Sequence, residues 1–238
     1  MGCAYARAAV RYTAIENVRN ERRPSRDERA MLCALPPGFA ATRTELHRVA
    51  IEVLKPARER VTGRFGLRAL PGGFGTAPFG EAVQLHVDGT ELVHRDGTAI
   101  TREPLRNVDP DAAAALAAWY AFAAGVLEEL RAETGLEHDP TPAQLWPEHF
   151  DIAIELGSDA GGVRAGYGAS PGDELHPEPY LYVVPWSATV QGELWAATAF
   201  TGAELAYAEL LATGDRRETA LEFFRTRRDE LLNGEDRR

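Results

Sequence analysis

The first regular hydrophobic pattern along the chain has helical spacing. Between Thr42 and Thr62, apolar residues recur every three or four positions, which predicts an amphipathic helix. Thr42 and Glu45 have the spacing of a capping box at its start, and Gly63 follows its end. Pro56 lies inside this segment and should kink or divide the helix, because proline has no backbone N–H to donate.

A different pattern follows, with the period of β-strands. Three short runs of alternating apolar and polar residues lie between residues 82 and 101, and Asp88-Gly89 and Asp96-Gly97 separate them. Asp-Gly favours a type I′ turn, in which both central residues need positive φ. The pattern therefore predicts an antiparallel β-meander over about residues 82–101.

A long helix is predicted from Pro110 to about Thr134. Asp109 is in position to cap it, proline suits its first turn, and Gly135 marks its end. Apolar residues occur nearly all round this helix, so we expect it to be largely buried.

The last part of the chain predicts further strands and a terminal helix. Apolar and polar residues alternate from Phe150 to Leu156, which is typical of a strand with one buried face. The other predicted elements are strands at 163–169, 180–186 and the more ambiguous 194–207, and a helix at 215–232 capped by Asp215 and Glu218. The fold class is therefore α+β, with antiparallel β-sheet packed against the long helix and the C-terminal helix.

The predicted elements divide the chain into three parts. Residues 1–30 lack an apolar periodicity and carry a net charge of +3, which predicts a disordered tail or a start codon placed too early, with Met31 as the true beginning. Residues 31–136 hold the first helix, the β-meander and the long helix. Residues 142–238 form a β-rich part with its terminal helix, and we expect the two parts to pack as one unit.

Composition and charge narrow the function classes. The chain has 238 residues, of which 45% are hydrophobic and 26% charged, as in a soluble globular protein. Its net charge of −10 would repel nucleic acid and anionic membranes, so neither is an expected partner. The absence of a secretory pattern and the presence of only two cysteines, Cys3 and Cys33, favour a cytoplasmic protein.

Several common catalytic motifs are absent from the sequence. The glycine-rich stretch Gly72–Thr76 lacks the lysine of a phosphate-binding loop and does not match the dinucleotide fingerprint, so it predicts a bend between strands. No Gly-x-Ser-x-Gly, His-Glu-x-x-His or Cys-x-x-Cys occurs. The usual serine hydrolase, zinc protease and dithiol mechanisms are therefore not indicated.

Two segments, 146–151 and 170–180, concentrate residues that carry chemistry. If the strand from Phe150 turns Phe150 inward, His149 and Asp151 project together from its opposite face. The second segment has the residues of a tight turn at Ser170–Asp173 and is stiffened further along by prolines. Aromatic residues that could line an apolar pocket nearby, although core packing is their commoner role, are Trp119, Trp146, Trp186, Trp195, Tyr167, Tyr180 and Tyr182.

The side chains of these segments suit two kinds of site. A divalent metal is one candidate cofactor, because histidine and carboxylate ligands with an open position suit zinc, iron or manganese; its ligands would be His149, Asp151, Glu174 and His176. General acid and base groups without metal are the other, and the candidate catalytic residues are His149, Asp151, His176, Glu178 and Tyr180. Short motifs of this kind also occur by chance, so a purely structural role stays open.

The same segments resemble a known protein family. Residues 146–151, 168–173 and 177–183, and the stretches 62–68 and 72–76, are similar to signature stretches of a family of actinobacterial hypothetical proteins. The resemblance extends over about residues 42–232. The C-terminal half also resembles a broader domain of unknown function with similar Ser-Pro-Gly-Asp and Pro-Glu-Pro-Tyr stretches. The resemblance implies a cytoplasmic setting and supplies no mechanism.

Two functions are consistent with these observations. The first is a small-molecule site, either in a binding protein or in a metal-dependent hydrolase-like protein, built from the two segments. It predicts that their side chains converge in one pocket. The alternative is a non-catalytic binding or protein-interaction module, for which a second copy of the chain, in a homo-oligomer, is one candidate partner. This alternative predicts a contiguous exposed apolar patch.

Overall fold

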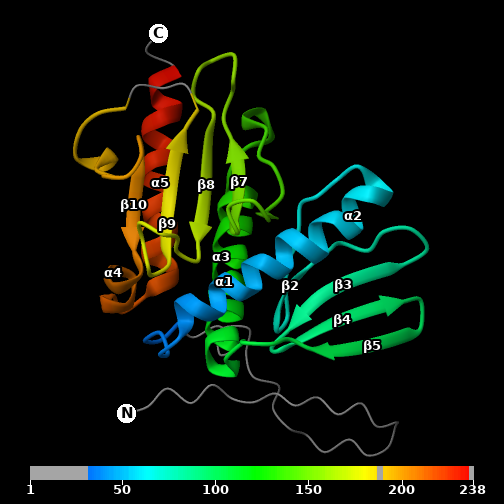
Figure 1. The fold of residues 1–238 in the computed structure, drawn as a ribbon. Coiled ribbons are helices and arrows are strands. Elements are labelled where there is room, and N and C mark those ends of the chain that lie inside the picture. The colour runs from blue at the N-terminus through cyan, green and yellow to red at the C-terminus, as the bar shows by residue number, and fades with distance from the viewer. Residues whose placement is uncertain (1–31, 187–189, 236–238) are drawn as a thin grey trace, which may run out of the picture.

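The computed structural model describes residues 32–186 and 190–235, so the predicted N-terminal tail and Met31 lie outside the described residues. The helices are α1 (Phe39–Val49), α2 (Lys55–Thr62), α3 (Pro110–Glu133), α4 (Tyr207–Ala212) and α5 (Arg216–Glu235), with 3-10 turns at Leu136–His138 and Glu193–Trp195 (Figure 1). The strands are β1 (Arg68–Leu70), β2 (Gly73–Gly75), β3 (Val83–Asp88), β4 (Glu91–Asp96), β5 (Ala99–Pro104), β6 (Gln144–Trp146), β7 (Asp151–Leu156), β8 (Ala165–Ser170), β9 (Tyr180–Pro185) and β10 (Ala203–Ala206).

The strands form two antiparallel sheets of five strands each. Sheet A has the order β10-β9-β8-β7-β6, and sheet B has the order β1-β2-β3-β4-β5. A single bridge between Leu67 and Leu145 links the two sheets. The predicted α+β class, with antiparallel sheet, a long helix and a C-terminal helix, is confirmed.

Helix α3 is the centre of the hydrophobic core. It contacts β1 and β2 of sheet B, β7 and β8 of sheet A, and helices α1 and α5. The Asp109 carboxylate accepts hydrogen bonds from the N–H groups of Asp111 and Ala112, which confirms the predicted cap. By length and composition α3 could cross a membrane, but 56% of its most apolar window is buried inside the structure, as in a core helix of a soluble protein.

The first helix differs from the prediction at its start. It begins at Phe39 with Gly38 as its N-cap, so Thr42 is not the capping residue. Thr42 is instead buried, and its hydroxyl accepts a hydrogen bond of 3.0 Å from the backbone N–H of Asp109. The Thr42 hydroxyl thus joins α1 to the start of α3, which a local capping pattern cannot reveal.

The first helix is interrupted before Pro56 but is not divided at it. A π-helical turn, Ala50–Leu54, separates α1 from α2, and Pro56 is the second residue of α2. Such a turn is a common response where one residue cannot donate the regular backbone hydrogen bond. Gly63 ends α2 in the left-handed conformation, with φ of 66°, as predicted.

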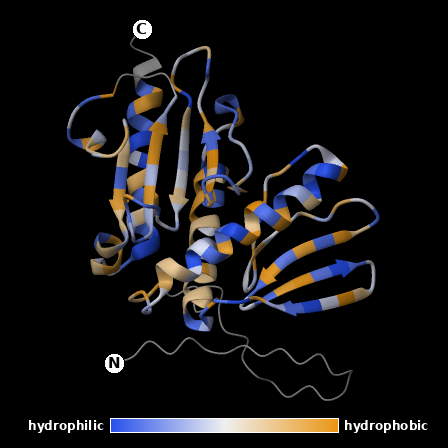
Figure 2. Cartoon of the chain, in the orientation of Figure 1, coloured by the Kyte–Doolittle hydropathy of each residue, from blue (hydrophilic) through white to orange (hydrophobic). Residues whose placement is uncertain are grey.

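The β-meander is confirmed, but its turns are of another type. Asp88 pairs with Glu91 across β3 and β4, so the central turn residues are Gly89 and Thr90. Only Gly89, with φ of 60°, has positive φ, which fits a type II′ turn with glycine in the first central position. Figure 2 shows alternating hydrophilic and hydrophobic positions along β3 and β4.

The prediction of a strand over 194–207 is wrong for most of its length. Only residues 203–206 form a strand, β10, and helix α4 begins at Tyr207. The C-terminal helix is confirmed, and Asp215 caps it by accepting a 3.0 Å hydrogen bond from the Glu218 N–H.

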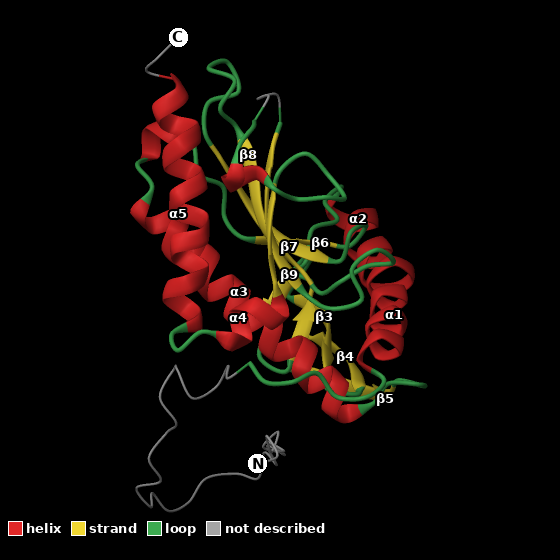
Figure 3. Cartoon of the chain, turned by 90° about the vertical axis from the view of Figure 1, so that its left-hand side faces the viewer, coloured by secondary structure: helices red, strands yellow, loops and turns green. Residues whose placement is uncertain are grey.

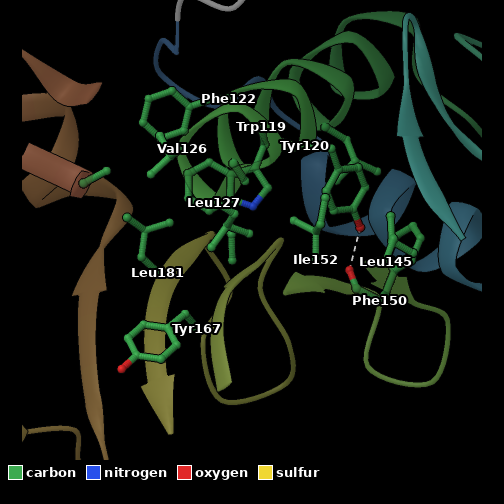
Figure 4. Packing of buried hydrophobic residues seen from close by; sticks show 14 of the residues in the cluster. Trp119, Tyr120, Phe122, Val126, Leu127, Leu145, Phe150, Ile152, Tyr167 and Leu181 are labelled. Atoms are coloured by element: carbon green, nitrogen blue, oxygen red, sulfur yellow. Dashed lines mark hydrogen bonds between the residues drawn. The ribbon is translucent and has the colours of Figure 1, made fainter. Parts of the chain in front are cut away.

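Phe150 fixes the entry into β7. It has a left-handed backbone, with φ of 58°, and its ring is 1% exposed. The ring packs edge-on against Phe74 and Tyr120 and stacks on His47. The Tyr120 hydroxyl donates a 2.5 Å hydrogen bond to the Phe150 carbonyl (Figure 4). The predicted strand therefore begins one residue later, at Asp151.

We expect Tyr120→Phe to reduce the free energy of unfolding by about 1–3 kcal/mol, because it leaves the buried Phe150 carbonyl without its donor. Urea unfolding followed by circular dichroism measures this change. An unchanged midpoint would show that the bond does not hold the turn before β7.

Candidate functional site

The two faces of sheet A have different surroundings. Helices α3 and α5 cover one face, whereas α1 and α2 lie on the other side (Figure 3). Alternate residues of β7 point to this second face and include Asp151, Ala153 and Glu155, while Ile152 and Ile154 belong to the core. The second face is where the predicted chemistry-bearing residues gather.

Strand β8 presents glycines to this face. Gly168 pairs with Ala153 on one side and with Tyr182 on the other, and Gly166 pairs with Glu155. A Cβ atom on Gly168 would overlap the ring of Tyr182, whereas one on Gly166 would have only a backbone oxygen of Val184 at 4.0 Å. Tyr182 therefore lies across Gly168, and the neighbouring Gly166 stays uncovered.

A pocket with a volume of about 290 Å³ occupies this place. Its lining residues come from β6, the loop after β6, β7, β8 and β9, and they are Trp146, His149, Asp151, Ala153, Glu155, Gly166 and Tyr182. The pocket exists because two neighbouring positions, Ala153 and Gly166, have little or no side chain.

Asp151 is the most buried ionisable group of the pocket. Its side chain is 6% exposed, and the Tyr182 hydroxyl donates a short hydrogen bond to its Oδ2 atom. Its other oxygen, Oδ1, is buried and has no hydrogen-bond partner among the described residues. A carboxylate can accept up to about four hydrogen bonds, so Asp151 has unused accepting capacity beside the pocket.

Burial sets the protonation of this pair. It raises the pKa of Asp151, although the Tyr182 hydrogen bond and the nearby His149 lower it in part. Burial and the adjacent Asp151 carboxyl raise the pKa of Tyr182 well above its ordinary value. Tyr182 therefore keeps its proton and donates it, while Asp151 ionises less readily than an exposed aspartate.

The cations nearest to the pocket are already paired. Arg164 lies 3.1 Å from Glu155 and 3.2 Å from Asp139. Lys55 lies 2.6 Å from Glu148, which directly precedes His149. The Asp151 carboxyl has no ion pair with a lysine or arginine among the described residues.

A second polar cluster lies beside the pocket, in the loop between β8 and β9. His176 Nδ1 is 3.4 Å from Asp173 and its Nε2 is 3.2 Å from Glu204 of β10, both ion-pair distances without hydrogen-bond geometry. The His176 ring also packs at 4.5 Å against Tyr180. This cluster is held by contacts within its own loop and by the adjacent strand.

Asp173 organises this loop. Its carboxylate accepts hydrogen bonds from the N–H groups of Leu175 and His176 and from the Tyr180 hydroxyl, at 2.7–2.8 Å. Burial acts to raise the pKa of Asp173, but these hydrogen bonds together lower it. Arg43 of α1 reaches the same loop and donates to the carbonyls of Pro171, Asp173 and Pro177.

The two clusters meet through neighbouring tyrosines of β9. Tyr180 and Tyr182 lie two residues apart on one face of the strand, with ring centroids 6.2 Å apart. Tyr182 bonds to Asp151, and Tyr180 bonds to Asp173. Polar groups of the two predicted segments thus form one continuous surface on the second face of sheet A.

The structure brings together some of the predicted site residues. His149 and Asp151 line one pocket, in keeping with their expected common face. His176 and Tyr180 lie in the adjacent cluster. Glu174 and Glu178 are exposed and do not line the pocket.

The predicted metal ligands are not gathered at one point. Over residues 32–186 and 190–235, no group of three or more His, Cys, Asp or Glu side chains is arranged to hold a metal ion. His149 and Asp151 both line the pocket, but His149 lies in the turn before β7 and not on the strand, so strand alternation does not account for its position. Spacing alone could not show that His176 turns towards Glu204.

The sequence did not predict the other pocket residues as site residues, although it named two of them as aromatic candidates. Tyr182 is the partner of Asp151, and its position two residues after Tyr180 on a strand gave a usable signal. Trp146 lines the pocket as one of the predicted aromatic candidates, whereas Trp119 and Tyr167 are buried in the core. Glu204 and the glycines of β8 gave no signal, because their roles depend on strand pairing.

Comparison of the chain with protein-family models, curated proteins and solved structures finds no match.

The two glycines of β8 provide a matched test of this geometry. We expect Gly168→Ala to reduce the free energy of unfolding by about 1–3 kcal/mol, because its methyl group must displace the half-buried Tyr182 ring. Gly166→Ala should change it by no more than about 0.5 kcal/mol, because its methyl group enters the pocket. Chemical unfolding of both variants checks this, and equal effects would contradict the described positions of Tyr182 and the pocket.

The raised pKa of Asp151 predicts how stability depends on pH. The folded protein binds this proton more tightly than the unfolded chain, so stability falls as pH rises from about 4 through the folded pKa. The asparagine in Asp151→Asn does not titrate. As pH rises over this range, the free energy of unfolding of this variant should therefore increase relative to that of the wild type, and above the range the difference should stay constant. Tyr182→Phe should extend the range upwards, because it removes a hydrogen bond that lowers the pKa. Parallel pH profiles for the wild type and Asp151→Asn would contradict the raised pKa.

Proposed function

We propose that this chain is a soluble, cytoplasmic small-molecule-binding protein whose site is the pocket on the second face of sheet A. The observation that carries the proposal is the buried carboxyl group of Asp151, which lines the pocket and has one oxygen, Oδ1, without a hydrogen-bond partner among the described residues. A buried polar atom without a partner costs about 1–3 kcal/mol. A bound ligand that donates a hydrogen bond to the Asp151 carboxyl group would offset part of this cost.

The other lining residues support ligand binding. Trp146 supplies an aromatic surface, and Tyr182 and His149 supply polar groups around a common space of about 290 Å³. A concave site with aromatic surface and a few convergent polar groups is the usual form of a small-molecule site. Asp151 and His149 could also act as acid and base towards a bound substrate, since geometry places both on the pocket.

A metal-dependent hydrolase is the less favoured form of this proposal. Its four predicted ligands are divided between the pocket, which holds His149 and Asp151, and the β8–β9 loop, where Glu174 is exposed and His176 lies between Asp173 and Glu204. The proposal therefore rests on the pocket groups themselves.

The alternative, a protein-interaction module, gains no specific support. It predicts a contiguous apolar patch, whereas the large exposed apolar side chains come from separate elements and loops. They are Val61, Ile100, Leu136, Leu175 and Trp186. Scattered exposure of this kind is normal for a protein surface. Membership of the actinobacterial family and self-association both stay predictions.

A library of small fragments screened by ligand-observed NMR tests the proposed function. We expect at least one fragment to bind the wild type and to lose binding in Gly166→Val, whose side chain projects into the pocket. Gly214→Val is the matched control, because Gly214 is exposed, has open space around it and lies after α4 rather than in the sheet. A screen without any binder sensitive to Gly166→Val would reject the pocket as a binding site.

A further inference from the structure

The pocket lining has an unusual balance of charge. Of its seven residues, Asp151 and Glu155 are acidic, and none is a lysine or an arginine. Glu155 is neutralised by Arg164, from which it lies 3.1 Å away. Asp151 has only the neutral Tyr182 hydroxyl as its side-chain partner. The pocket therefore holds a carboxyl group without a lysine or arginine partner among the described residues, and His149, which lowers the pKa of Asp151, is the one basic side chain of the lining.

The hydrogen bonding of Asp151 indicates which chemical group a ligand should carry. The Asp151 carboxyl group accepts one hydrogen bond, from Tyr182, and can accept more, so a ligand in the pocket would donate to this carboxyl group. An N–H donor that also carries positive charge suits a buried carboxyl best, because charge-assisted hydrogen bonds are about twice as strong as neutral ones. An anionic ligand would meet two carboxylates in the lining and no lysine or arginine there.

The indole of Trp146 adds a second determinant. It belongs to the same lining as Asp151, its side chain is half-buried, and its ring is packed at 6.0 Å against Phe65. Tryptophan offers the best aromatic face both for stacking with an apolar ring and for contact with a cation. A ligand with an ammonium group and a short apolar or aromatic body would use both determinants.

We propose that the pocket recognises a compact primary amine, bound as its ammonium ion with an N–H group on the Asp151 carboxyl group and its apolar part against Trp146. This inference rests on the proposed function and adds the chemical class of the ligand. Because the site requires a positively charged ligand, it selects against carboxylates and phosphates. Because it requires an N–H donor, it selects against quaternary ammonium compounds.

Four ligands with one common scaffold test the proposal on the unaltered protein. They are 2-phenylethylamine, 2-phenylethanol, 3-phenylpropanoate and trimethyl(2-phenylethyl)ammonium. Each is titrated into isotopically labelled protein at neutral pH, and the amide signals of Gly166 and Tyr182 and the indole N–H signal of Trp146 are followed by NMR. We expect 2-phenylethylamine to shift these signals and to bind about 10- to 100-fold more tightly than the other three.

Variants then assign the selectivity to Asp151. Asp151→Asn keeps the size of the side chain and an oxygen that can accept from Tyr182, and it should weaken amine binding by about 10- to 100-fold. Glu174→Gln is the matched control, because it removes the charge of an exposed carboxylate outside the pocket, and it should leave binding unchanged.

The outcomes separate this inference from the proposed function. Equal or tighter binding of the alcohol, the carboxylate or the quaternary ammonium compound at the same signals would overturn the primary-amine class and leave a small-molecule site. If none of the four shifts these signals while the fragment library yields binders sensitive to Gly166→Val, the inference also fails and the proposed function stands. Failure of both experiments overturns both.

Discussion

The packing of helix α3 against both sheets constrains the rest of the molecule. It contacts β1 and β2 on one side and β7 and β8 on the other. Because this buried helix covers one face of sheet A, the alternate side chains of each strand point away from it, to the second face. Phe150, tied to α3 by the Tyr120 hydroxyl, sets where that alternation begins. The position of the candidate site thus follows from the packing of the core.

The chemistry of the site follows from side chains of very different size on three neighbouring strands. Tyr182 crosses Gly168 to reach Asp151, which buries the carboxyl, and Gly166 leaves an uncovered space next to it. Burial without a full set of hydrogen bonds is energetically unfavourable. An incompletely hydrogen-bonded carboxyl group beside an open pocket would favour the binding of a ligand that carries a hydrogen-bond donor. The proposed function therefore couples stability and ligand binding at one carboxyl group.

Local patterns in the sequence predicted the parts of the fold that depend on local interactions. The meander and the Asp109 cap follow from short-range periodicity and turn chemistry. His149 and Asp151 both line the pocket, but the left-handed backbone of Phe150 separates His149 from the strand, so periodicity alone does not place it. The capping role of Thr42 was predicted wrongly, because its hydroxyl bonds to the distant Asp109 N–H. The Asp151–Tyr182 pair and the pocket over Gly166 depend on the pairing of β7, β8 and β9, which no local pattern specifies.

The most direct test of the account is a high-resolution crystal structure of the protein soaked with 2-phenylethylamine. We expect the amine nitrogen within about 2.7–3.2 Å of an oxygen of the Asp151 carboxyl group, with the phenyl ring against Trp146 and the Tyr182 hydroxyl still bonded to Asp151. A structure in which Asp151 Oδ1 is paired with a group of the chain itself, or in which the amine binds away from Gly166, would contradict it.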